Sequence, residues 1–131
     1  MNDKNSKILQ DSLSRCVEDK DFFRIFYVLF LETAQEIKEK FKDTDFERQS
    51  QMMEDSLNVI LLMDEPGWES NQTLIDIAES HKKMSVKSEF YQYWQISLLA
   101  AVAECDPQYD ETILRAWREK LEKGIEFMMT H

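Results

Sequence analysis

Only two glycines and two prolines interrupt the 131 residues of this chain. Both residue types weaken or end helices, whereas the remaining sequence is supplied with strong helix formers such as Glu, Lys, Gln, Leu and Met. With so few breakers, we expect an all-α protein. The length predicts one domain, residues 1–131, with a single hydrophobic core.

The charge balance restricts the possible partners. The formal net charge is -10, from 26 acidic and 16 basic residues. A nucleic acid or an anionic membrane surface needs a basic face, so neither is expected as a partner. No apolar run approaches the ~20 residues of a membrane span, and the polar first residues do not resemble a signal peptide. We therefore expect a soluble, cytoplasmic protein.

Cap residues, breakers and apolar spacing together predict about seven helices. Asn5 or Ser6 is expected to cap the first helix, Ser70 the fifth and Ser85 the sixth. The second helix is apolar on nearly every side and should cross the centre of the domain. The approximate ranges are residues 6–16, 22–31, 36–41, 46–63, 71–81, 86–105 and 112–128.

One histidine lies on an apolar helical face. Leu74, Ile77, Ala78 and His81 fall at positions i, i+3, i+4 and i+7, and the other histidine, His131, is the last residue. A neutral imidazole pressed into an apolar wall can bind a metal through one nitrogen. A lone histidine of this kind is more often an ordinary core or surface residue, so this helix by itself leaves both interpretations open.

Enzyme motifs are nearly absent. The chain has no glycine-rich phosphate loop, nucleophile elbow, HExxH or EF-hand loop, and Cys16 and Cys105 are too few for a disulfide framework or a zinc site. Polar side chains nevertheless fall on otherwise apolar helical stripes, and these are Tyr27, Gln49, Tyr91 and Trp94. With His81, they predict a pocket that has one axial ligand on one side and hydrogen-bond donors on the other.

The order and spacing of these residues resemble those of globins, in particular bacterial single-domain globins and the globin domain of flavohaemoglobins. Tyr27 resembles the distal tyrosine of that family, and Phe41, fourteen residues later, resembles the aromatic residue at its corner. Residues 41–49 are similar to the corner that leads into the distal helix. Residues 74–86 resemble the proximal helix with its histidine, and Tyr91 matches the proximal tyrosine.

The resemblance implies a globin fold of about seven helices around haem b, with His81 as the ligand of the iron. Tyr27, Gln49 and Trp94 are then expected to contact a bound diatomic gas, which tyrosine and glutamine stabilise by hydrogen bonds. The remaining residues are expected to enclose the haem or to bind its carboxylates, and they are Phe41, Phe46, Met53, Leu57, Ile77, Val86, Tyr91, Leu98, Lys83 and Lys87.

Two points depart from the flavohaemoglobin pattern. Gln51 competes with Gln49 for the distal role, but a helix that turned Gln51 to the haem would also turn Asp55 there, and a bare carboxylate is costly to bury. The glutamate that pairs with the proximal histidine in flavohaemoglobins has no counterpart, because Met128 and Met129 occupy the nearby turn. We therefore expect a less electron-rich histidine.

The expected function is the reversible binding of a diatomic gas, O₂ in the first place and NO or CO as alternatives. Tight holding by Tyr27 and Gln49 suits sensing, storage or scavenging better than oxygen transport. One alternative is a nitric oxide dioxygenase or peroxidase-like haem enzyme served by a separate reductase. Another is a haem-free globin-fold module that binds a signalling partner.

Overall fold

The computed structural model describes residues 3–61 and 66–130, and it contains helices and no strand in these ranges. This agrees with the all-α prediction. The elements are α1 (Asp3–Glu18), α2 (Phe22–Leu31), α3 (Gln35–Lys40), α4 (Phe46–Ile60), the 3₁₀ turn η1 (Trp68–Ser70), α5 (Gln72–Lys83), α6 (Ser88–Cys105) and α7 (Glu111–Thr130). None of the described helices is long and apolar enough to cross a membrane.

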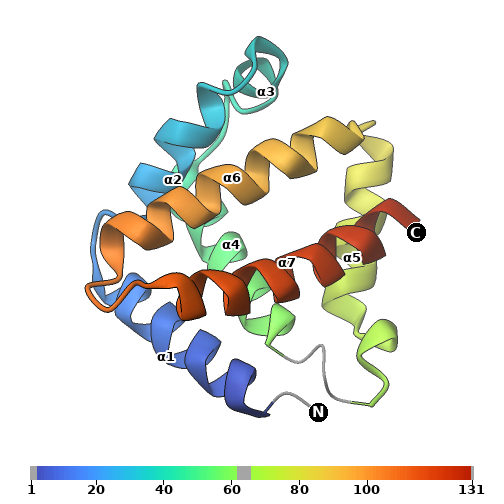
Figure 1. Cartoon of the computed structure of the whole chain (residues 1–131). Helices are drawn as coiled ribbons and strands as arrows, with labels where there is room; N and C mark the ends of the chain where they lie inside the picture. Colours follow the sequence, from blue (N-terminus) through green and yellow to red (C-terminus); the bar gives the residue numbers. More distant parts are fainter. Residues whose placement is uncertain (1–2, 62–65, 131) are drawn as a thin grey trace.

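Helices α6 and α7 form the middle of the molecule (Figure 1). Helix α2 packs along α6, and α1 packs along α7. Helix α5 contacts α4 and the C-terminal half of α7, so that α5 faces α2 across the interior. Helices that pack in this way bury their apolar stripes against one another.

The structure corrects three expected caps. Helix α1 already begins at Asp3, so Asn5 and Ser6 lie inside it. Helix α5 is capped by Asn71, whose side chain accepts a hydrogen bond from the backbone nitrogen of Leu74 at 3.2 Å, and not by Ser70. Ser85 does not cap α6, because its backbone takes a left-handed conformation (φ 55°) two residues before the cap position.

The boundaries of α4 follow from its own cap. The Asp45 carboxylate accepts hydrogen bonds from the backbone nitrogens of Glu47 and Arg48 at 3.1 and 3.3 Å, which satisfies two of the free N–H groups at the start of the helix. The helix is described to Ile60. Its expected end at Met63 lies outside the described residues.

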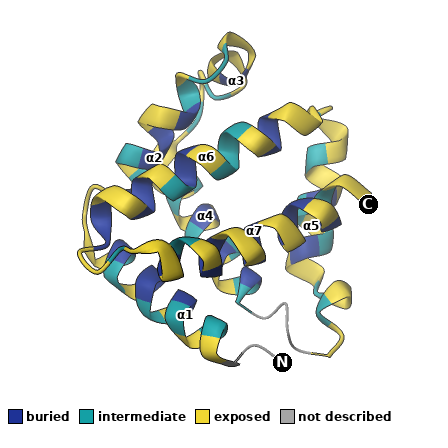
Figure 2. Cartoon of the chain, viewed as in Figure 1, coloured by how far each residue is buried: buried dark blue, intermediate teal, exposed yellow. Residues whose placement is uncertain are grey.

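Helix α2 is buried on one side only. Phe22, Phe26, Tyr27 and Phe30 lie in the core, at spacings of three and four residues. Its apolar character on every side predicts a helix through the centre, but the side that carries Val28 is exposed (Figure 2). The helix therefore forms one wall of the interior and does not cross its middle.

A buried polar cluster joins α1, α7 and the end of α6. The Asp106 carboxylate accepts hydrogen bonds from Ser12 Oγ at 2.6 Å and from Arg15 Nε and Nη2 at 2.6 and 3.0 Å. Ser12 Oγ in turn accepts from Trp117 Nε1 at 2.9 Å. Burial by itself raises the pKa of Asp106, but the hydrogen bonds from Arg15, Ser12 and the backbone of Gln108 outweigh it, so this pKa lies below its ordinary value.

The two cysteines are buried free thiols beside this cluster. Burial raises the pKa of Cys16 to about 12 and that of Cys105 to about 11. Both groups therefore stay protonated at neutral pH, in the form that is a poor nucleophile and a poor metal ligand.

Candidate functional site

A cavity of about 210 Å³ lies between α2, the end of α3, α4, α5, α6 and α7. Most of its wall is aromatic or aliphatic, as is typical of sites for large apolar ligands. The structure brings many of the predicted site residues together on this wall, and they are Tyr27, Phe41, Gln49, Met53, Ile77, His81, Val86, Tyr91 and Trp94.

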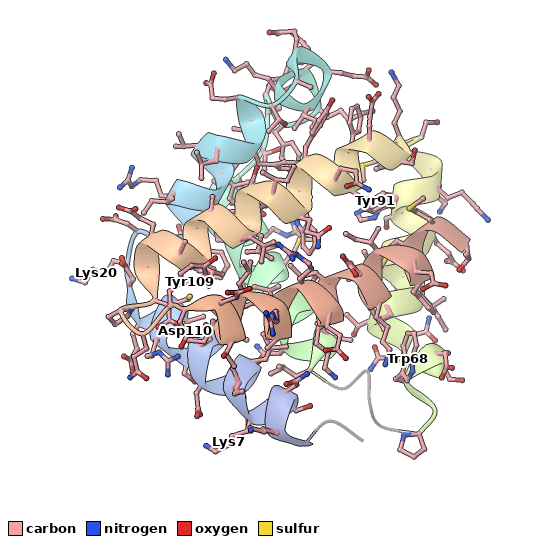
Figure 3. The ribbon with its side chains drawn as sticks, in the orientation of Figure 1. Lys7, Lys20, Trp68, Tyr91, Tyr109 and Asp110 are labelled. Atoms are coloured by element: carbon pink, nitrogen blue, oxygen red, sulfur yellow. The ribbon has the colours of Figure 1, made fainter. Side chains whose placement is uncertain are left out.

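His81 reaches the cavity from the last turn of α5. Leu74 and Ala78, on the same face of the helix, are buried in the core, and their packing turns the imidazole inward. The imidazole Nδ1 lies 3.1 Å from the hydroxyl of Tyr91. Tyr91 lies near the start of α6, as Figure 3 shows. Burial lowers the pKa of His81 below 6.5, so the ring is neutral at pH 7.

The contact with Tyr91 decides which nitrogen of His81 is available. When Nδ1 carries the proton, it donates to the oxygen of Tyr91, and the lone pair of Nε2 is free for a metal. The two rings also meet edge to face, with centroids 5.7 Å apart. The backbone nitrogen of Val86 donates to the carbonyl oxygen of His81 at 3.1 Å, which holds the chain after the histidine close to α5. These contacts fix the orientation of the imidazole before any ligand binds.

Tyr27 supplies a hydrogen-bond donor on the α2 side of the cavity. Burial raises the pKa of its hydroxyl to about 12, so the group is protonated at neutral pH. The hydroxyl donates to the backbone oxygen of Gln49 at 3.4 Å, near the limit for a hydrogen bond. The ring is held by Phe46 and Phe41, whose centroids lie 5.3 and 6.0 Å away. Tyr27 is therefore a rigid side chain with a weakly engaged donor.

The two glutamines of α4 have different environments. Gln49 is half-buried and lies on the cavity wall, one turn before Met53. Gln51 is exposed, and its side-chain nitrogen donates to Asp55 Oδ1 at 3.1 Å. Asp55 is exposed as well. The register of α4 thus turns Gln49 to the cavity and leaves Gln51 at the surface.

Three of the predicted apolar residues lie behind the wall. The ring of Phe46 is 36% exposed and packs on Tyr27 and Phe41, so it supports the distal side without lining the cavity. Leu57 and Leu98 are fully buried in the core. Both side chains point inward as predicted, but they pack in the core and do not line the cavity.

The two predicted lysines are not on the wall either. Lys83 is exposed at the end of α5. Lys87 Nζ forms an ion pair with Glu36 Oε1 at 2.7 Å and lies 5.8 Å from the centre of the Phe90 ring. The Glu36 pair, with smaller contributions from Glu89, raises the pKa of Lys87 against the opposing effect of desolvation.

Several wall residues were not among the predicted site residues, and two groups of them bear on the site. Helix α7 contributes Leu121, Gly124, Ile125 and Met128, and α3 contributes Lys40. Gly124 offered a signal in the sequence, because a glycine inside a long helix costs about 0.5–1 kcal/mol relative to alanine. Nothing in the sequence around Lys40 distinguishes it from a solvated lysine.

No family model matches the chain, and none of the curated proteins matches it. Among solved structures, the chain is similar to a crystal structure of a Pseudomonas aeruginosa PAO1 protein that is described as structurally highly homologous to a human hemoglobin. The TM-score is 0.88 at 27% sequence identity, and the match covers 96% of each chain. Together with the arrangement of α1–α7, this likeness shows that the chain has a globin fold.

Proposed function

We propose that this protein binds haem b in the cavity, with Nε2 of His81 as the ligand of the iron. The observation that carries the proposal is the imidazole itself. It is neutral, it lies on the wall of an apolar cavity, and its Nδ1 is held by the Tyr91 hydroxyl at 3.1 Å. Hydrogen bonding at one imidazole nitrogen orients the other for a metal and raises its basicity.

The residues of the cavity wall suit a large and mostly apolar cofactor. Phe41, Met53, Ile77 and Val86 give the wall apolar surface, and among the described residues no carboxylate lines the cavity. Burying each large side chain against such a cofactor contributes roughly 1.5–3 kcal/mol. Gly124 of α7 also lines the cavity.

Bound haem would supply an iron that binds a diatomic gas reversibly, O₂ in the first place. The part of the chain would be to hold that gas. Tyr27 stays protonated and can turn its hydroxyl from the Gln49 carbonyl to the gas, since the present bond at 3.4 Å is weak. The Gln49 side chain and Trp94 lie on the same wall and would limit the room for water. A site that holds the gas in this way suits a protein that senses, stores or scavenges it.

Visible spectra of the purified protein after addition of haem test this proposal. We expect distinct spectra in the oxidised, reduced and carbon monoxide-treated states. His81→Gly should lose haem, and added imidazole should restore it, because the small ligand fits where the side chain was. Gln51→Ala, at the exposed position of α4, is the matched control and should bind haem as the unchanged protein does.

A protein that stays colourless with excess haem while its helical content is intact would contradict the proposal. That result would favour the haem-free alternative, in which the globin fold serves as a binding module. Retention of haem by His81→Gly without imidazole, with an unchanged spectrum, would contradict the assignment of the iron ligand alone.

A further inference from the structure

Two contacts tie α3 to the segment that joins α5 and α6. Lys40 Nζ donates to the carbonyl oxygen of Met84 at 3.0 Å, and Glu36 pairs with Lys87 at 2.7 Å. Met84 is the C-cap of α5, three residues after His81, and its side chain is 50% exposed. Lys40 itself is exposed but also lines the cavity. The contact of Lys40 with Met84 therefore lies where the cavity meets the surface.

Lys40 is chemically different from the rest of that wall. Among the described lining residues it alone carries a formal charge, since His81 is neutral. No described carboxylate forms an ion pair with it, and the partner of its ammonium group is a neutral backbone carbonyl. Lys87, by contrast, is already paired with Glu36, and Lys83 does not reach the cavity.

We propose that Lys40 binds a carboxylate of the cofactor at the mouth of the cavity. The inference rests on the proposed haem function, because haem combines an apolar ring with two carboxylates at one edge. A carboxylate carries a full negative charge that attracts the ammonium group, whereas the Met84 carbonyl is neutral, so a carboxylate competes well for Lys40. An ammonium group has three donors, so Lys40 can also keep its bond to Met84. The carboxylate is thereby joined to the segment that follows His81.

The experiment compares haem with haem dimethyl ester, in which both carboxylates are blocked. The protein variants are Lys40→Met, Lys40→Arg and the matched control Lys83→Met, which changes an exposed lysine away from the wall. The measured quantity is the rate of cofactor loss to an excess of an acceptor apoprotein. We expect Lys40→Met to lose haem about three- to tenfold faster than the unchanged protein, as for a partly exposed charged hydrogen bond.

The ester separates the charge contact from a structural one. With the ester, Lys40→Met should match the unchanged protein, and the haem effect should shrink at high salt because this site is near the surface. Lys40→Arg should restore slow haem loss. In urea, the cofactor-free Lys40→Met protein should unfold at a midpoint close to that of Lys83→Met, because the bond from Lys40 to Met84 is exposed to solvent and contributes little.

Two results would overturn the inference while the proposed function stands. One is that Lys40→Met loses haem as slowly as the unchanged protein. The other is that it loses haem and the ester faster by the same factor, which would show that Lys40 acts only by tying α3 to Met84. If the unchanged protein binds neither compound, the proposed function itself fails and takes the inference with it.

Discussion

Replacing Tyr27 with phenylalanine is expected to speed the release of bound O₂ about five- to thirtyfold. The hydroxyl is protonated and lies on the wall of the cavity, with a pKa raised by burial to about 12. Bound O₂ carries partial negative charge, and a hydrogen bond to such a ligand contributes about 1.5–3 kcal/mol. Phenylalanine keeps the ring contacts with Phe41 and Phe46, so the loss is confined to the hydroxyl.

When Tyr27 turns to bound O₂, it gives up its hydrogen bond to Gln49, and this loss reduces the net stabilisation of the O₂ complex. Its hydroxyl now donates to the Gln49 carbonyl at 3.4 Å, a long bond worth roughly 0.5–1 kcal/mol. The difference is about 1–2 kcal/mol, and each 1.4 kcal/mol corresponds to a factor of about ten. A shorter bond to Gln49 would have cancelled most of the effect.

The assay is the dissociation rate of O₂, measured by rapid mixing of the oxygenated protein with excess carbon monoxide. Carbon monoxide itself carries little negative charge, so its own dissociation rate should change by less than about twofold. Tyr93→Phe serves as the matched control, because Tyr93 is half-buried on α6 but does not line the cavity. Equal O₂ dissociation in Tyr27→Phe and the unchanged protein would refute this role of the hydroxyl.

Further predictions concern stability and the two sides of the cavity. Asp106→Asn should lower the free energy of unfolding in urea by about 3 kcal/mol, since it leaves a partly buried guanidinium without its charge partner, and a loss under 1 kcal/mol would contradict this. The cofactor-free protein should lose stability as the pH falls below 6.5, because burial depresses the pKa of His81 and the unfolded chain then binds a proton that the folded chain does not. His81→Gln should flatten this slope, and urea midpoints at several pH values measure it. Tyr91→Phe should speed haem loss about tenfold by removing the partner of Nδ1, with no effect of the same size on the cofactor-free fold. Gln49→Ala should speed O₂ release, whereas Gln51→Ala should not, and equal effects would contradict the register of α4.

The helices could be predicted because their signals are local. Breakers and apolar spacing place α4 and α5 to within a few residues, and the same spacing turns His81 inward. The caps were harder, because Ser70 and Asn71 are both good cap residues and only the backbone path selects Asn71. At Ser85, a left-handed backbone replaces the expected cap.

The cavity wall was partly predictable for a related reason. Tyr27 and Gln49 lie on apolar helical stripes, so their inward orientation follows from helical periodicity. Lysines have no such signal, because their long side chains reach whatever partner the tertiary fold brings near. Lys87 meets Glu36, fifty-one residues earlier, and Lys40 meets Met84, forty-four residues later. Contacts of this range are invisible to local spacing.

Helix α6 separates the His81–Tyr91 contact of the cavity from the buried polar cluster around Asp106. Tyr91 lies near its first turn, beside His81, and Asp106 follows its last residue in the cluster with Ser12 and Arg15. Fifteen residues of helix separate them by about 22 Å. Substitutions near Tyr91 can therefore change ligand affinity without disturbing the polar cluster around Asp106. Binding specificity and fold stability can then change independently.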